Sequence, residues 1–452
     1  MLNPEIFRQY DIRGIASKDM NEEDVVQLGQ GIGSYLKQQG HQFVAVGRDC
    51  RLTSDAYAER LIQGLMAAGC RVVDIGVCPT PVAYFAIRHL KTEGAVMVTA
   101  SHNPPEYNGF KICSGTDSVF GEQIQQIRKI IDARKFAAGQ GSRETYEILP
   151  DYIDYILENI DLKKPLKVGI DAGNGTGGVT AVPIITNLEC EVHELYTEMD
   201  GTFPNHEADP TIPANMADLI ALVKEKQLDV GLGFDGDADR LGVVDSDGSL
   251  VYGDQLMILF SREILSRKPG ATFISEVKCS QTMYDDIAKQ GGNPIMWKTG
   301  HSMIKQKMKE VKAELAGEMS GHLFFADRYF GYDDAVYAAC RLLEILADTG
   351  KTIRQLLADV PKTYNTPEIR MDCADRIKFK VVTKVTDYFR KLAKVIDIDG
   401  ARVLFDGGWG LVRASNTQPA LVLRFEALSE KRLAEIRTTV EAALEKIKKE
   451  VG

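Results

Sequence analysis

The chain lacks the features that mark membrane, secreted and disulfide-bonded proteins. No uninterrupted apolar stretch reaches the ~18 residues that a membrane-spanning helix needs. The N-terminal segment MLNPEIFRQYDIRG has no basic region followed by an apolar run, so we expect no signal peptide. The eight cysteines are scattered, with no C-x-x-C pair, which is typical of small core residues in a reducing compartment. We therefore expect a cytoplasmic protein.

An excess of positive charge is also missing. The formal net charge is −10, which argues against a nucleic acid or an anionic membrane as a partner. If the substrate is itself an anion, its attraction must come from a local basic cluster that opposes the overall field.

What the sequence does contain is a regular alternation of short β-branched segments with helical patterns. Three such cycles begin near FVAVG (43–47), LKVGIDAGNG (166–175) and TFISEV (272–277). Strands that alternate with helices predict α/β sheets with mostly parallel neighbours and helices on both faces.

The pattern changes after about residue 365, where a strand, a helix, two further strands and a charged C-terminal helix (429–449) indicate a small α+β domain. The expected fold is therefore α/β, with three similar mixed α/β domains and a smaller C-terminal α+β domain. The expected domains are residues 1–147, 148–250, 251–363 and 364–452.

The segment TASHNPPEYNGFK (99–111) follows directly on an apolar strand. Ligands of α/β sheets bind beyond the carboxyl ends of the strands, so Ser101 stands where a reacting hydroxyl would be useful. A serine alone is a weak nucleophile, but His102 and Lys111 could stabilise negative charge around it. The alternative is an ordinary turn, because serine, asparagine and proline are common turn residues.

The segment GFDGDADRLG (233–242) carries Asp235, Asp237 and Asp239 at alternate positions. Carboxylate oxygens are the hard ligands that magnesium and calcium prefer. A calcium-binding EF-hand loop would need glycine at Arg240 and glutamate at Ser246, so that interpretation fails. Few ligands beside an arginine fit magnesium better. A solvated acidic turn is the alternative.

Two further loops are rich in polar groups. GEMSGHLFF (317–325) places Glu318 and Ser320, which could hydrogen-bond sugar hydroxyls, beside His322, which could transfer a proton near neutral pH. RASNTQPA (413–420) offers hydroxyls, an arginine and backbone amides, a cradle for phosphate without a metal. A structural histidine and a plain turn are the respective alternatives. The basic residues that could form the local cluster are Arg13, Lys111, Arg240, Lys278, Lys298, His301 and Arg413.

The segment from Gly173 to Gly178 matches the G-x-G-x-x-G pattern of dinucleotide-binding sites, with Glu191 and Glu194 near the expected acidic position. A single match is weak evidence, and we expect Pro183 to interrupt the helix that should follow. We interpret the segment as a strand-to-helix turn.

The four loops that contain Ser101, the three aspartates, Glu318 and Arg413 occur in an order and at spacings that resemble the α-D-phosphohexomutase superfamily. The resemblance covers the whole chain. Within that superfamily the chain is most similar to the bacterial phosphomannomutase/phosphoglucomutase group, on the segments FRQYDIRG, TASHNPPEYNGFK, GEMSGH and RASNTQPALVLRFEA. Met319 and Asn416-Thr417 differ from the pattern of phosphoglucosamine mutases. Ala238 stands where the familiar form of the metal loop has glycine, a change that we expect a turn to tolerate.

The resemblance implies four domains around a central cleft and a role for each motif. It makes Ser101 the phosphoserine and implies Mg²⁺ held by Ser101, Asp235, Asp237 and Asp239. It implies Lys111, His322 and Arg13 as candidates for the general acid or base. The implied substrate contacts are Tyr10, His102, Arg240, Lys278, His301, Glu318, Ser320, Arg413, Ser415, Asn416 and Thr417.

The implied activity is the reversible conversion of a hexose 1-phosphate, of mannose or glucose, to the 6-phosphate. It proceeds through phosphoserine and a glucose or mannose 1,6-bisphosphate, with sugar phosphates as the only partners. The alternatives are a phosphoglucosamine mutase, a metal-dependent phosphatase with a serine nucleophile, and a non-catalytic sugar-phosphate-binding protein. The last two leave the sugar loop or the metal loop without a use.

Overall fold

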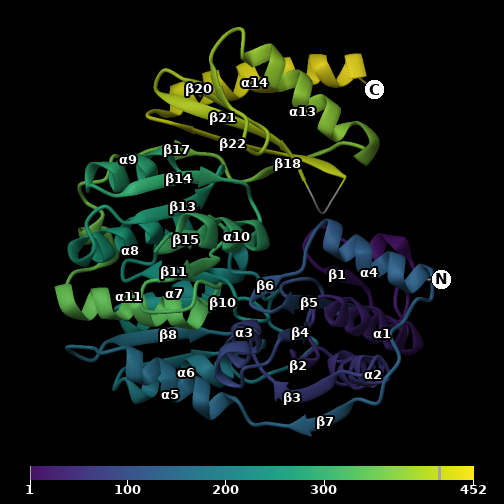
Figure 1. Ribbon diagram of the computed structural model, residues 1–452. Coiled ribbons are helices and arrows are strands. Elements are labelled where there is room, and N and C mark those ends of the chain that lie inside the picture. Colours follow the sequence, from purple (N-terminus) through teal and green to yellow (C-terminus); the bar gives the residue numbers. More distant parts are fainter. Residues whose placement is uncertain (1, 416–418, 452) are drawn as a thin grey trace.

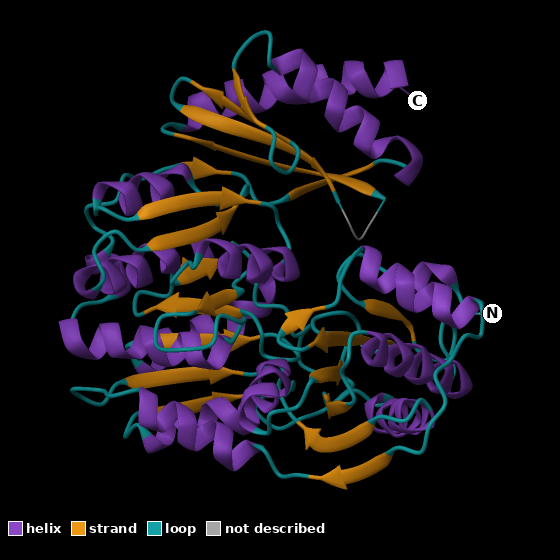
Figure 2. Ribbon diagram, in the orientation of Figure 1, coloured by secondary structure: helices purple, strands orange, loops and turns teal. Residues whose placement is uncertain are grey.

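The computed structural model describes residues 2–415 and 419–451 and arranges them in four units, each built on its own β-sheet (Figure 1). Helices cover the sheets of the first three units, whereas the two helices of the fourth lie on one side of its sheet (Figure 2). None of the helices in these described segments has the length and apolar character of a membrane span.

The sheet of the first unit has the order β1-β5-β4-β2-β3-β7, with β6 paired to β5. Its strands are β1 (Ile12–Ile15), β2 (Phe43–Arg48), β3 (Arg71–Val77), β4 (Gly94–Val98), β5 (Tyr107–Ser114), β6 (Asp117–Ser118) and β7 (Ser142–Thr145). Its helices are α1 (Glu22–Gln38), α2 (Ser54–Ala67), α3 (Thr80–His89) and α4 (Glu122–Asp132). Alternate residues of β2 face opposite sides: Val44 and Val46 pack under α1, α2 and α4, whereas Ala45 packs on the side of α3.

The second and third units repeat this plan with smaller sheets. The second has the strand order β12-β11-β10-β8-β9 and the third β14-β13-β15-β16. The elements of the second are α5 (Leu149–Asn159), β8 (Lys167–Asp171), α6 (Gly178–Asn187), β9 (Glu191–Leu195), α7 (Ala217–Lys226), β10 (Val230–Phe234), β11 (Leu241–Asp245) and β12 (Leu250–Val251). Those of the third are α8 (Gly253–Arg267), β13 (Thr272–Glu276), α9 (Gln281–Lys289), β14 (Asn293–Trp297), α10 (His301–Val311), β15 (Leu315–Gly317), β16 (Leu323–Phe325), α11 (Ala335–Thr349) and α12 (Ile353–Leu356).

The expectation of mostly parallel strands holds for one part of each of the three sheets, the part that ends in the edge strand β7, β9 or β14. In the second unit β8 pairs in parallel with β9 and β10, but β10 pairs antiparallel with β11. Apart from the pair of β1 with β5, the antiparallel pairs arise where a short connection, rather than a crossover helix, joins consecutive strands. This matters for the site, because the turn between β10 and β11 contains the three aspartates.

The helix after β8 corrects one expectation. We expected Pro183 to interrupt it, but α6 runs through this residue. A proline in a helix removes one backbone hydrogen bond without necessarily ending the helix. Here Ala181, Ile184 and Ile185 are fully buried, so the packing of α6 outweighs the lost bond. The glycine-rich segment before it is a strand-to-helix turn, as expected.

The fourth unit is a sheet of antiparallel strands with two helices on one face. Its elements are β17 (Tyr364–Asn365), β18 (Ile369–Asp372), α13 (Asp375–Phe389), β19 (Lys394–Ile396), β20 (Ala401–Phe405), β21 (Gly408–Ala414), β22 (Ala420–Ala427) and α14 (Glu430–Val451). Trp409 and Leu411 pack against Val277 of the third unit. The buried guanidinium of Arg402 donates to the carbonyl oxygens of Val277 and Cys279, at 2.6 and 2.8 Å. The fourth unit is therefore joined to the third by a specific buried contact.

Candidate active site

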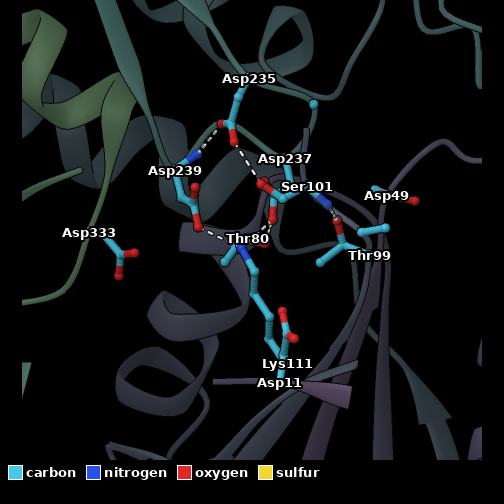
Figure 3. Close-up of polar contacts among 12 residues, drawn as sticks. Asp11, Asp49, Thr80, Thr99, Ser101, Lys111, Asp235, Asp237, Asp239 and Asp333 are labelled. Carbon is cyan, nitrogen blue, oxygen red and sulfur yellow. Dashed lines mark hydrogen bonds and ion pairs between the residues drawn. The ribbon is translucent and has the colours of Figure 1, made fainter. Parts of the chain in front are cut away.

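Ser101 lies three residues beyond the end of β4, in a loop that enters the junction of the first two units. Its side chain is buried, and its hydroxyl Oγ donates to Oδ2 of Asp235 at 2.8 Å (Figure 3). Nδ1 of His102 lies 3.1 Å from the same Oγ. The backbone of Ser101 has φ +52°, a left-handed conformation that is rare for residues other than glycine. The structure therefore places this hydroxyl against the acidic loop.

The aspartates of the acidic loop are fully buried and point toward one another (Figure 3). Asp235, Asp237 and Asp239 each offer a carboxylate oxygen within 4.8 Å of the other two. Oδ1 of Asp237 and Oδ1 of Asp239 are buried without a hydrogen-bond partner. Buried carboxylate oxygens without a donor are costly unless a cation meets them, so this donor set fits a hard metal ion. Ala238 has φ +54°, which explains why glycine suits this position.

Lys111 is a buried cation that contacts this triad directly. Its Nζ lies 2.6 Å from Asp237 and 2.5 Å from Asp239. Burial and the neighbouring carboxylates raise the pKa of Asp235 well above its usual range. Burial opposes ionisation of Asp239 as well, but Lys111 and His322 outweigh it and lower the pKa of Asp239. Thr80, at the start of α3, donates its hydroxyl to Asp237 at 2.5 Å.

The third unit contributes a second polar layer. Nε2 of His322 accepts from Nε of Arg240 at 3.0 Å, and its Nδ1 lies 3.2 Å from Asp333. The ring of His301 stacks on that of His322 with centroids 5.7 Å apart. Oε1 of Glu318 accepts from the backbone nitrogen at position 300 at 2.6 Å, and burial raises the pKa of Glu318. Ser320 is partly exposed in the same turn.

Two residues of the first unit reach across to neighbouring loops. Arg13, in β1, donates to the carbonyl oxygen of Ala100 at 3.1 Å and also contacts Asp11. The hydroxyl of Tyr10 donates to the carbonyl oxygen of Thr299 at 2.9 Å. Tyr10 therefore connects the first unit to the segment that leads into His301.

The C-terminal loop begins at the end of β21. Nε of Arg413 donates to Asp399 at 3.0 Å, and the same carboxylate oxygen accepts from the backbone of Thr299 at 3.1 Å. Lys278 contacts Glu368 at 3.2 Å. Ser415 is buried, whereas Asn416 and Thr417 lie outside the described residues. Lys298 has an exposed side chain.

Sequence reasoning missed several polar residues that line these groups, namely Thr80, Glu276, Asp333, Glu368 and Asp399. Each is a single polar residue within or beside an ordinary helix or strand. Only the adjacent pair Asp333-Asp334, directly before α11, gave a weak signal.

A buried serine that faces a triad of carboxylates able to hold a metal ion, on an α/β scaffold, defines a class of site suited to phosphoryl transfer. Four family descriptions match the chain, all of phosphoglucomutase/phosphomannomutase. They are alpha/beta/alpha domain I over residues 4–138, domain II over 150–248, domain III over 252–364, and the C-terminal domain over 368–443. The chain belongs to the phosphoglucomutase/phosphomannomutase family.

Individual relatives agree with this assignment. A phosphomannomutase/phosphoglucomutase of Pseudomonas aeruginosa is 48% identical over 434 residues, 96% of this chain and 94% of that protein. A phosphoglucomutase of Neisseria gonorrhoeae is 42% identical over 448 residues, 98% of this chain and 97% of that protein. The crystal structure of a phosphoglucomutase/phosphomannomutase family protein from Burkholderia thailandensis has a TM-score of 0.93 and 42% identity, covering 100% of this chain and 99% of that one.

Proposed function

We propose that this protein reversibly converts α-D-hexose 1-phosphates of glucose and mannose into the 6-phosphates, through a phosphoserine at position 101. One observation carries the proposal: Oγ of Ser101 lies 2.8 Å from Asp235, at the edge of a buried triad of carboxylates. A serine used only in a turn would not need this acidic surrounding.

The reaction has two transfers. Phosphoserine 101 donates its phosphoryl group to the free hydroxyl of the sugar, which gives a bound 1,6-bisphosphate. The intermediate turns end for end, and its other phosphoryl group returns to Ser101. Each transfer breaks one O–P bond and forms another, and the proton of the attacking hydroxyl ends on the oxygen that leaves, so that atoms and charge balance. Such chemistry depends mainly on positioning and charge neutralisation.

We assign the acidic triad to a magnesium ion. Asp235, Asp237 and Asp239 would hold it together with an oxygen of Ser101, and it would neutralise charge on the transferring phosphoryl group. Lys111, His322 and Arg13 stand as candidates to hold or move the proton of the attacking hydroxyl. The hydrogen bond from Nε of Arg240 to Nε2 of His322, with Asp333 3.2 Å from Nδ1, fixes the orientation of the His322 ring.

The remaining polar residues bind the two ends of the substrate. Glu318 and Ser320 contact sugar hydroxyls, while Arg413 and Ser415, with Asn416 and Thr417, hold the phosphate that is not reacting. Tyr10, His102, Arg240, Lys278 and His301 complete the cleft. This cradle must accept the phosphate in both orientations of the sugar, which explains a second anion site far along the chain.

The discriminating assay supplies glucose 1-phosphate or mannose 1-phosphate with magnesium and a trace of glucose 1,6-bisphosphate. We expect the corresponding 6-phosphates. Release of inorganic phosphate without a 6-phosphate would favour a serine phosphatase, and the absence of any turnover would favour a binding protein. Glucosamine 1-phosphate in a parallel reaction tests the phosphoglucosamine alternative.

A further inference from the structure

Arg51 takes no part in the proposed chemistry, yet it is buried, with only 3% of its surface exposed. Its charged guanidinium contacts the loop that carries Ser101. Its Nη2 donates to the carbonyl oxygens of Ser101, at 2.7 Å, and Asn103, at 2.6 Å. Its Nη1 donates to those of Pro104, at 2.7 Å, and Tyr107, at 3.0 Å. Four carbonyl oxygens, three of the serine loop and one at the start of β5, therefore meet one planar guanidinium, a geometry that lysine cannot reproduce.

Arg51 contacts the carbonyl group of Ser101, a residue whose backbone conformation is unusual. Ser101 has a left-handed backbone, and its nitrogen donates to Oγ1 of Thr99 at 2.9 Å. On the other side, the Ser101 carbonyl oxygen lies so close to Gly236 that a Cβ there would approach it to 2.5 Å. A rarely populated conformation persists only when its surroundings fix it. Arg51 and Gly236 together fix the direction in which the hydroxyl points.

Arg51 is itself fixed before any substrate binds. Its Nε lies 3.2 Å from the buried carboxylate of Asp49, which also accepts from Ser54 at 2.5 Å. The ring of Phe203, from the second unit, lies 5.1 Å from the guanidinium carbon. The serine loop is therefore tied to both units between which it lies.

We propose that Arg51 is a positioning residue, which holds Ser101 Oγ and its phosphoryl group in line for the sugar hydroxyl and out of reach of water. The inference rests on the proposed function. The competing reaction is hydrolysis, in which water attacks phosphorus, the Oγ–P bond breaks, and serine and inorganic phosphate form. Transfer needs one alignment of the phosphoryl group with the sugar hydroxyl, whereas hydrolysis can occur in many orientations of the phosphoryl group. A loosened loop therefore slows transfer and favours hydrolysis.

The test compares Arg51→Lys with Arg48→Lys. Arg48 lies in the same strand region but pairs with Asp55 and Asp74, away from the serine loop. We expect Arg51→Lys to lower kcat about 100-fold, because a displacement of a reacting group by about 1 Å has an effect of this size. The KM for glucose 1-phosphate should stay within about twofold of the wild-type value. The phosphoenzyme is prepared with glucose 1,6-bisphosphate, and its hydrolysis is followed without sugar by intact-mass analysis. We expect the rate of hydrolysis, relative to the rate of transfer, to rise at least about tenfold. Arg48→Lys should match the wild-type protein.

The ratio of hydrolysis to transfer does not depend on the fraction of folded protein, so a merely structural role would leave it unchanged. Equal ratios in Arg51→Lys and the wild-type protein overturn the inference. If Arg51→Lys does not fold, Phe203→Leu should raise the ratio by a smaller factor, and an unchanged ratio there also overturns it. A wild-type protein that converts no hexose phosphate defeats the proposed function instead. In that case the rate of hydrolysis without sugar, measured on protein phosphorylated as purified, still tests Arg51: equal rates in Arg51→Lys and the wild-type protein overturn the inference.

Discussion

The two ends of the site are built differently. The reaction end comprises Ser101, the three aspartates and Lys111, all buried and joined by contacts of 2.5 to 2.8 Å. The anchor end comprises Arg413 and Ser415 on the fourth unit, where Arg413 is held by its ion pair with Asp399 at 3.0 Å. Several closely joined charged groups suit bond making, while the planar guanidinium of Arg413 suits a phosphate that arrives on either end of the sugar.

The largest effect is expected at the nucleophile. Ser101→Ala removes the oxygen that carries the phosphoryl group, so we expect kcat to fall roughly 10⁵-fold or more. Intact-mass analysis should show that a species heavier by one phosphoryl group, present in the wild-type protein, is absent from this variant. Persistence of the heavier species would place the phosphorylation on another residue.

The next effect concerns the metal. Asp237→Asn removes one charge from the triad at nearly constant shape, so we expect kcat to fall roughly 10²–10³-fold and the magnesium titration to shift to higher concentration. Asp247→Asn, in the exposed turn after β11, is the matched control. An unaltered titration for Asp237→Asn would remove the metal assignment.

The anchor end should respond in KM rather than in kcat. Arg413→Lys keeps the charge but loses the planar fork, so we expect KM to rise about 10-fold with kcat nearly unchanged. Arg437→Lys, exposed on α14, serves as the control. A fall in kcat with constant KM would mean that the two ends are not functionally separate.

The smallest effect is predicted at the joint between the third and fourth units. Burial opposes ionisation of Glu368, but Lys278 and Arg370 outweigh it and lower its pKa to about 2. Because the folded pKa lies below the ordinary value, the contact stabilises the fold above about pH 4.5 and is lost as pH falls toward 2. Glu368→Gln should therefore cost about 1 kcal/mol in the free energy of unfolding at pH 7 and almost nothing near pH 2, measured by denaturant titration. An equal cost at both pH values would contradict the pairing.

The sequence predicted the fold class because helical and strand periodicities alternate clearly in the first three units and change in the fourth. The placement of Ser101 at a strand end also followed from the motifs, and its position beside the aspartates was implied by the family resemblance. Pro183 was misjudged because local propensity was weighed without the packing that retains α6. Arg51 could not be found, since its role depends on contacts with a loop far along the chain.

The central claim is that Ser101 carries phosphate between two ends of one sugar. Protein labelled with ³²P at serine is mixed with an equal amount of unlabelled glucose 1-phosphate and quenched within a single turnover. The account predicts that the label leaves the protein and appears in glucose 1,6-bisphosphate and glucose 6-phosphate. Label that remains on the protein while glucose 6-phosphate accumulates, or that appears as inorganic phosphate, would contradict it.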